Sequence, residues 1–167
     1  TFADDSQPAL DVIMPDVDYI ARRRDRLAGL VLTHAHEDHL GAVPYLWSKL
    51  RCPVYATPFA AAVLRRKLKE DGPGEDVPIT EVPLSAKFTV GPFDLELITL
   101  THSIPEPNAV AIRTKAGVVL HTGDWKIDAA PLVGEVTDET ALKRLGAEGV
   151  LAMVCDSTNA MLEGRSG

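Results

Sequence analysis

Residues 32–41 of this chain read LTHAHEDHLG, and they hold His34, His36 and His39, three of the five histidines in the sequence. The segment directly follows an apolar run, GLVLT at residues 29–33, which is expected to be a buried strand. Imidazoles add little to an apolar core, whereas a loop at a strand end is held by a rigid scaffold and often carries reactive groups. The stretch therefore predicts a functional loop.

The spacing within this loop favours metal binding. His34 and His36 are two positions apart, so on an extended segment both side chains project to the same side and can hold one ion. Asp38 and His39 follow where the chain turns toward a helix, and they are expected to point at a neighbouring position. Imidazole and carboxylate are common zinc ligands, so the loop predicts ligand pairs for two adjacent ions. The alternative is a polar surface loop that happens to be rich in histidine.

Two further strand-end segments carry the other candidates. His102 in TLTHSIPEP could complete the first ion's ligands, and Asp124 in HTGDWK could bridge both ions because a carboxylate has an oxygen for each. The alternatives are a hydrogen-bonded loop histidine and a turn aspartate. His121 lies within a strand, so we expect it to have a structural role or to support a ligand.

Short runs of Val, Ile and Leu alternate with helical patterns along the chain. Strands are expected at residues 9–14, 29–33, 53–56, 93–100, 109–114, 117–122 and 149–158. Helices are expected at residues 16–29, 41–50, 58–70 and 138–146, and a loop at 71–78. The helix at 58 has Thr57 as its predicted N-cap, and the last strand is predicted to be buried. This order predicts an α/β fold (α+β in some schemes) with sheets covered by helices.

The composition indicates one globular domain. The chain has 167 residues, of which 46% are apolar, enough to bury a core. No run approaches about 18 consecutive apolar residues, so no membrane span is predicted, and the first residues lack the pattern of a secretory signal. Because the chain starts at Thr1 and stops at GRSG, we interpret it as a segment of a longer protein.

The two cysteines, Cys52 and Cys155, lie far apart in apolar surroundings, and neither has a CxxC partner. We expect both to be small buried hydrophobic residues of a cytoplasmic protein, with a disulfide or a thiolate ligand as the alternative. The tryptophans, Trp47 and Trp125, are expected to pack in or near the core, with base stacking as the alternative.

The net charge of −7 argues mildly against a nonspecific nucleic-acid coat. The basic residues are concentrated, however, in two blocks at residues 22–26 and 65–69. We expect each block to cover the solvated face of a helix, and a surface that tracks phosphates is the alternative.

Five segments of the chain read VIMPD, LTHAHEDHLGAVPYL, THSIPE, HTGDWKID and CDSTNA. Together they resemble the metallo-β-lactamase fold hydrolases, and among them ribonuclease J of the β-CASP nuclease branch. The resemblance implies an αββα sandwich with a dinuclear zinc site at one edge of the paired sheets. Residues 1–167 would then be a partial, incomplete metallo-β-lactamase domain, and about 157–167 a junction toward a β-CASP domain that is absent here.

The resemblance also implies an activity, which is metal-dependent cleavage of RNA, both internal and processive from the 5′ end. By motif, His34, His36 and His102 would hold one zinc, Asp38 and His39 the other, and Asp124 would bridge. Asp38 and Asp124 are the expected catalytic residues, and manganese is possible in place of zinc. RNA is the expected partner, the full-length protein is expected to be a homo-oligomer, and no membrane association is expected.

The chain departs from the family pattern in extent. Family members have a further carboxylate-bearing strand ahead of this point, and they contribute a last zinc-binding histidine from beyond the β-CASP domain. The segment alone is therefore expected to be weak or inactive as a nuclease. Two rival hypotheses remain, a small-molecule metallohydrolase of thioesterase or lactonase type and an inactive metal-binding segment. The roles of Lys126 and Asp128, in the TGDWKID motif, are not predicted from the sequence.

Overall fold

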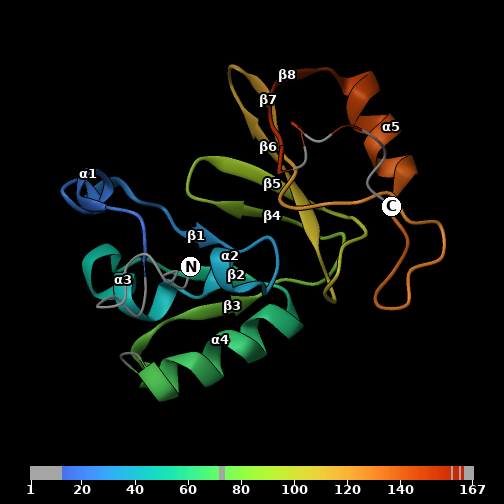
Figure 1. The fold of residues 1–167 in the computed structure, drawn as a ribbon. Coiled ribbons are helices and arrows are strands. Elements are labelled where there is room, and N and C mark those ends of the chain that lie inside the picture. The colour runs from blue at the N-terminus through green and yellow to red at the C-terminus, as the bar shows by residue number, and fades with distance from the viewer. Residues whose placement is uncertain (1–12, 72–73, 159, 162, 164–167) are drawn as a thin grey trace.

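The computed structural model describes residues 13–71, 74–158, 160–161 and 163, and these residues form two packed β-sheets with helices on the outside (Figure 1). The first sheet is parallel, with strand order β1-β2-β3. Its strands are β1 (Leu30–Val31), β2 (Val54–Ala56) and β3 (Ile79–Glu81). The helices that accompany it are α2 (Glu37–Leu40), α3 (Val43–Leu50) and α4 (Pro58–Asp71). Short helical turns, α1 (Asp18–Ala21), η1 (Arg24–Arg26) and η2 (Gly74–Asp76), complete this half.

The second sheet has five strands in the order β4-β5-β6-β7-β8. They are β4 (Lys87–Val90), β5 (Phe93–Thr99), β6 (Asn108–Thr114), β7 (Gly117–His121) and β8 (Val150–Val154). Neighbouring strands are antiparallel except β7 and β8, which run parallel because helix α5 (Glu139–Glu148) connects them by a crossover. The strands predicted at 109–114 and 117–122 are confirmed as β6 and β7, which pair as an antiparallel hairpin.

Three apolar clusters define the order of the layers. One packs α4 against the first sheet and contains Val54 and Leu64. A second lies between the two sheets, and a third packs the second sheet against α5. Alternate residues of β5 show the division, because Leu97 belongs to the cluster between the sheets and Ile98 to the cluster under α5. The order helix, sheet, sheet, helix confirms the predicted αββα architecture.

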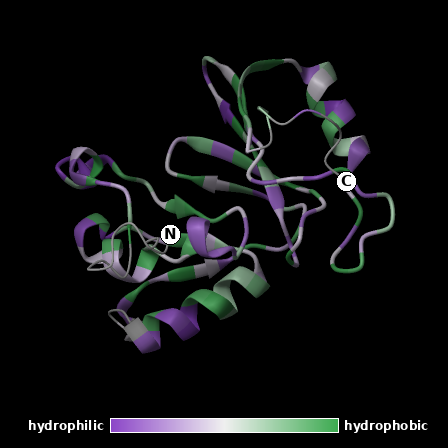
Figure 2. Cartoon of the chain, in the orientation of Figure 1, coloured by the Kyte–Doolittle hydropathy of each residue, from purple (hydrophilic) through white to green (hydrophobic). Residues whose placement is uncertain are grey.

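Helix α4 illustrates why these sequences fold as they do. Ala60, Ala61, Leu64 and Leu68 are buried against the first sheet, while basic residues occupy the opposite face. Figure 2 shows this helix banded in green and purple, as expected for one apolar and one charged face. Pro58 at its first position matches the prediction, because proline lacks only an N–H that the helix leaves unpaired there.

Several boundary predictions hold. Helix α3 ends at Leu50 as predicted and begins at Val43, two residues after its predicted start. Helix α5 is capped by Asp138, whose side chain accepts a hydrogen bond from the amide of Ala141 at 2.9 Å. Helix α5 runs to Glu148, two residues beyond the predicted end. Cys52 is buried as predicted. The described chain has no helix that is both long and apolar enough to cross a membrane.

Other predictions are wrong. The helix predicted at 16–29 is reduced to α1 and the turn η1, because neither buries a residue that would stabilise it by packing. The strand predicted at 29–33 is only β1, and both of its residues are half-buried. The predicted loop at 71–78 contains the last residue of α4 and the turn η2. The predicted strand at 9–14 lies mostly outside the described residues, and residues 13–14 are not in a strand.

The last strand differs most from its prediction. Every residue of β8 is exposed, and Leu151 and Met153 have exposed fractions of 66% and 60%. The physical reason is that neither face of β8 is packed, since none of its residues belongs to the apolar cluster under α5 or to the cluster between the sheets. Among the described residues, β8 is also an edge strand that pairs only with β7. Cys155, which follows it, is also exposed, contrary to the prediction of a buried thiol.

Candidate metal centre

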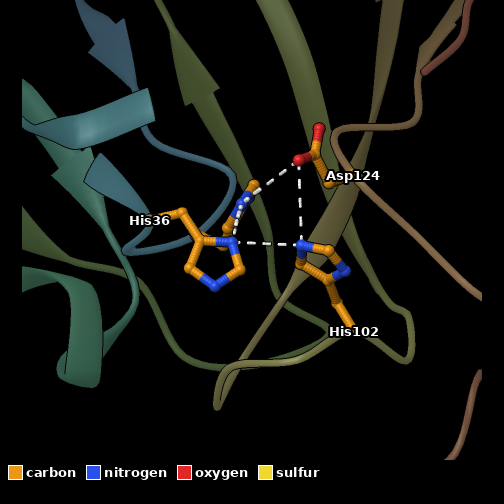
Figure 3. A group of neighbouring side chains, drawn as sticks. His36, His102 and Asp124 are labelled. Carbon is orange, nitrogen blue, oxygen red and sulfur yellow. Dashed lines mark hydrogen bonds and ion pairs between the residues drawn. The ribbon is translucent and has the colours of Figure 1, made fainter. Parts of the chain in front are cut away.

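The predicted ligands come together from three loops at one edge of the paired sheets. Figure 3 shows His36, His102 and Asp124 pointing toward one another. His34 and His36 lie between β1 and α2, and Asp38 and His39 lie within the single turn of α2. His102 follows β5, and Asp124 follows β7. The three loops adjoin because the two sheets pack with these strand ends at a common edge.

The first group consists of His34, His36, His102 and Asp124, whose ligand atoms all lie within 4.8 Å of one another. His36 Nδ1 is 3.2 Å from His34 Nε2 and 3.1 Å from His102 Nε2. One carboxylate oxygen of Asp124, Oδ2, is 3.9 Å from His34 Nε2 and 3.7 Å from His102 Nε2. Three imidazole nitrogens and one carboxylate oxygen therefore face a common point.

These separations fit a tetrahedral zinc ion. Ligands bound at about 2.0–2.1 Å in tetrahedral geometry lie about 3.3 Å apart. The nitrogen–nitrogen distances of 3.1 and 3.2 Å are close to that value, and the distances to the Asp124 oxygen, 3.7 and 3.9 Å, are longer. Histidine nitrogen and carboxylate oxygen are also the donors that zinc prefers when cysteine is absent.

His34 is prepared to act as a neutral donor. Its side chain is buried, and its Nδ1 lies 3.0 Å from the hydroxyl of Thr33, so the Nε2 atom faces the group. Burial, together with the neighbouring His39, His36 and His102, lowers the pKa of His34 to about 3. Burial and His36 likewise lower the pKa of His102. Both imidazoles are therefore neutral near pH 7, which is the form that binds a metal ion.

The second group consists of Asp38, His39 and Asp124, whose ligand atoms also lie within 4.8 Å of one another. His39 Nε2 is 3.2 Å from Asp124 Oδ1 and 3.5 Å from Asp38 Oδ2. Asp124 thus directs Oδ1 toward the second group and Oδ2 toward the first. This division of its two oxygens is the geometry expected of a bridging carboxylate.

The turn that positions Asp124 depends on Gly123, which has a φ angle of 58°. A Cβ atom at this position would lie 3.1 Å from the carbonyl oxygen of Asn108 and 3.1 Å from Cβ of Thr33. The amide of Gly123 donates to His121 Nδ1 at 3.0 Å. His121 therefore fixes this turn and belongs to neither ligand group, in agreement with its predicted structural role.

Most of the other charged and aromatic residues singled out from the sequence form hydrogen bonds or ion pairs. The Trp47 side chain donates to the carbonyl oxygen of Cys52 at 2.8 Å, which supports its packing role. Lys126 and Asp128 form an ion pair at 3.2 Å, and Trp125 is 40% exposed beside them. In the block at 65–69, three residues form ion pairs, with Glu81, Glu70 and Glu37. This pairing favours the predicted solvated helix face over a surface that tracks phosphates.

Sequence comparison places the fold in a family. A model described as "Metallo-beta-lactamase superfamily" matches residues 5–136. The chain belongs to the metallo-β-lactamase superfamily. The match includes every candidate ligand, from His34 to Asp124.

Within this superfamily, the predicted resemblance to ribonuclease J is confirmed. The chain is 48% identical to ribonuclease J of Sinorhizobium meliloti over 99% of its own length and 29% of that protein. It is 40% identical to ribonuclease J of Helicobacter pylori strain 26695 over 93% of its own length and 23% of that protein. The chain thus spans less than a third of the length of these relatives.

A solved structure shares the architecture of this chain. The protein of unknown function from Enterococcus faecalis V583 superposes with a TM-score of 0.61 at 17% identity. The superposition covers 96% of this chain and 44% of that one. At this identity the likeness concerns the fold alone.

Some supporting residues were not predicted. Thr33 orients His34, and Gly123 allows the approach of the Asp124 turn, yet neither was singled out from the sequence. The glycine in ThrGlyAsp could have been recognised as a turn residue, because glycine adopts positive φ without steric cost. The hydroxyl of Thr33 offered no such signal, since any strand residue could precede the histidines.

Proposed function

We propose that this chain is the metal-binding part of a ribonuclease that hydrolyses the phosphodiester bonds of RNA, internally and from the 5′ end. The observation that carries the proposal is the divided carboxylate of Asp124, which has one oxygen facing each ligand group. Two adjacent groups of this kind suit hydrolysis of a phosphodiester. Similarity to ribonuclease J over nearly the whole chain supports RNA as the substrate.

In this proposal His34, His36, His102 and Asp124 hold one zinc ion, and Asp38, His39 and Asp124 hold the second. Two such ions would lower the pKa of a water between them and offset the charge that develops on the phosphate oxygens. Nitrogen-rich donors favour zinc, and manganese is the alternative metal.

The chain's own residues keep the ligands in place and in the required protonation state. The pKa of His34 is about 3, so this imidazole stays neutral at every pH at which RNA hydrolysis would be measured. Asp124 fixes the spacing of the two ligand groups because both of its oxygens are committed. Asp38 has an exposed side chain, so the second group is open to solvent on the side where a phosphate could approach.

The proposal includes the setting of the protein. Residues 1–167 form a partial domain of the ribonuclease, about 157–167 lead toward its β-CASP domain, and the full-length protein is a cytoplasmic homo-oligomer. The net charge of −7 means that RNA contacts must be local and not spread over the surface.

The test compares three substrates with the full-length protein. Metal is removed with a chelator, and hydrolysis of a 5′-monophosphorylated RNA, a thioester and a lactone is measured before and after zinc or manganese is returned. We expect metal-dependent cleavage of the RNA and no comparable turnover of the other two. Metal-dependent hydrolysis of the thioester or lactone without RNA cleavage would establish the small-molecule hydrolase instead. Metal binding with no turnover of any substrate would establish an inactive metal-binding protein.

A further inference from the structure

The loop of residues 101–107 carries His102 and is fastened to both halves of the molecule. At its start, the amide of Thr101 donates to Thr137 Oγ1 at 3.0 Å, and the amide of Lys126 donates to the carbonyl oxygen of Thr101 at 2.9 Å. These contacts join the loop to the segment that follows Asp124. At its end, the amide of Asn108 donates to the carbonyl oxygen of Thr33 at 3.0 Å, beside the first histidine.

Glu106, near the end of this loop, makes a third attachment that reaches helix α4. Its Oε2 accepts a hydrogen bond from the amide of Phe59 at 2.9 Å. Phe59 is in the first turn of the helix, where backbone amides have no partner within the helix. A carboxylate at this position is also favoured by the helix dipole. Glu106 therefore caps a helix from 47 residues away in the sequence.

Thr57, the residue that was expected to cap α4, does not cap it with its side chain. Thr57 immediately precedes the helix and was predicted to be its N-cap, but its buried side-chain oxygen has no hydrogen-bond partner among the described residues. The prediction of side-chain capping by Thr57 is therefore wrong. At the start of α4, the amide of Phe59 is capped from the His102 loop. Thr57 contributes only its carbonyl oxygen, which accepts a hydrogen bond from the amide of Ala61 at 2.8 Å.

The backbone of Glu106 is held in a conformation that requires support. Its φ angle is 58°, in the left-handed region that side chains other than glycine seldom adopt. Its carbonyl oxygen accepts a hydrogen bond from the side-chain nitrogen of Asn108 at 2.7 Å. Strained backbone of this kind persists where surrounding contacts enforce it, and such places are common near functional sites.

The consequence for the ligands follows from what α4 contacts. The helix packs on the first sheet, whose strand β1 leads directly into His34 and His36. Ile104 of the loop packs against the same cluster. Glu106 and Ile104 thus connect the His102 loop to the half of the molecule that supplies the other two imidazoles.

We propose that Glu106 is a positioning residue, whose capping of α4 sets where the 101–107 loop places His102 relative to His34 and His36. The proposal rests on the metal centre of the proposed function. Metal–ligand distances tolerate deviations of only about 0.2 Å, so a small displacement of the loop removes His102 as a ligand. Glu106 itself belongs to neither ligand group.

The test uses Glu106→Ala and Glu106→Gln in the full-length protein, with Glu81→Ala as the matched control. Glu81 also contacts α4, through Arg65, but from β3 and without touching the His102 loop. Binding of Co²⁺ is measured by competition with a chelator and by visible absorption, and thermal unfolding is measured without metal. We expect Glu106→Ala to weaken Co²⁺ binding about 10-fold or more and to change the absorption spectrum. Glu106→Gln, which retains an acceptor oxygen, should recover most of the affinity, and Glu81→Ala should leave Co²⁺ binding unchanged.

The outcomes separate a positioning role from a purely structural one. Unchanged Co²⁺ affinity and spectrum in Glu106→Ala, alongside reduced thermal stability, would make Glu106 a helix cap only and overturn the proposal. If Glu106→Ala does not fold, Glu106→Asp replaces it, because the shorter side chain cannot span the same distance, and wild-type Co²⁺ binding there would also overturn it. If the wild-type protein binds no Co²⁺, the metal centre of the proposed function fails, and the positioning role fails with it.

Discussion

The two ligand groups share Asp124 but differ in enclosure. The first has four members, and His34 within it is buried, whereas the second has three members, and Asp38 within it is 64% exposed. An enclosed group with four convergent donors needs little rearrangement to bind an ion. An open group with three donors leaves more positions to water and binds more weakly. One carboxylate can therefore join two metal positions of unequal strength.

The difference in enclosure follows from the origin of the ligands. The first group takes one or two residues from each of three strand-end loops, so both sheets must pack to form it. The second group takes Asp38 and His39 from the single turn of α2 and only Asp124 from elsewhere. A site between layers is shielded by them, while a site at the end of one helix faces the solvent.

The largest expected effect is that of Asp124→Asn in the full-length protein. Because Asp124 faces both groups, we expect RNA cleavage to fall at least about 100-fold, as when other charge-stabilising contacts are removed from active sites. RNA affinity should be nearly unchanged, since phosphate contacts away from the metal centre position the substrate. Cleavage rates on a 5′-monophosphorylated RNA and binding by filter retention measure the two quantities.

Asp94→Asn is the control for this variant. Asp94 is an exposed carboxylate on β5 whose side chain accepts a hydrogen bond from Thr89 at 3.1 Å, far from either group. The Asp94→Asn protein should cleave RNA at the wild-type rate. Wild-type cleavage by Asp124→Asn as well would show that Asp124 does not bridge the ions.

The next effect concerns metal content of the present chain. We expect about one tightly held zinc per chain after dialysis, in the four-residue group, and a second that is lost at least about 10-fold more readily. His34→Ala should abolish the tight binding, and His39→Ala should leave it in place. Zinc is measured by elemental analysis after the same dialysis of all three proteins. Two ions held with equal strength would contradict the expectation that the two ligand groups differ in zinc affinity.

A further variant, Glu96→Gln, tests whether a loss of stability alone changes the number of zinc ions bound per chain. Glu96 is buried under α5 and pairs with Arg113 at 2.9 Å and also with Arg144. Burial alone would raise its pKa, but the hydrogen bonds from Arg144 and Arg113 more than offset this, and the pKa of Glu96 is lowered from its ordinary value of 4.5. We expect the substitution to reduce the free energy of unfolding at pH 7 by roughly 1–3 kcal/mol.

The pH dependence of this loss has a definite sign. A carboxyl group with a lowered folded-state pKa stabilises the protein above its unfolded pKa, and this contribution is lost as pH falls through the folded value. The difference in the free energy of unfolding between wild type and Glu96→Gln should therefore become smaller below about pH 4.5. Urea unfolding at pH 7 and below pH 4 measures it, and a gap that widens in acid would refute the argument. Zinc content at pH 7 should be unaltered.

The smallest expected effect is that of Lys67→Met. Lys67 pairs with Glu37 at 2.8 Å, which ties α4 to α2, and α2 carries both residues that are unique to the second group. Partly exposed ion pairs contribute about 0.2–1 kcal/mol, so the weaker zinc should bind about 2- to 3-fold less tightly. The tight zinc should be unaffected. A competition titration with a zinc-sensitive dye measures the two zinc affinities separately. An equal loss of affinity at both groups would show that the Lys67–Glu37 ion pair does not act on the second group alone.

The sequence predicted which residues come together at the candidate metal centre better than it predicted the scaffold. His34, His36, Asp38 and His39 lie in one short loop, so their spacing alone carried the information that they share a site. Asp124 and His102 were recognisable as polar residues after strands, and strands from two packed sheets meet at one edge. Patterns that span a few residues were therefore sufficient for the candidate site.

Features that depend on distant packing were not predictable in this way. The apolar run of β8 was predicted to be a buried strand, but its exposure depends on which elements cover its two faces. The capping of α4 by Glu106 joins residues 47 positions apart, and no local pattern reports such a contact. The short strands β3 and β4 were missed because few of their residues are apolar and fewer are buried.

The members of the first ligand group are spread over residues 34 to 124 of the sequence. Metal binding by this group therefore depends on whether the chain has folded. Few of its contacts are local, so closing the loops that bring its members together costs chain entropy before any ion is bound. An ion that binds only the assembled group stabilises the native state by mass action. A chelator titration monitored by far-UV circular dichroism would then record the assembly of the two halves, because an ion can be held tightly only after both sheets have docked.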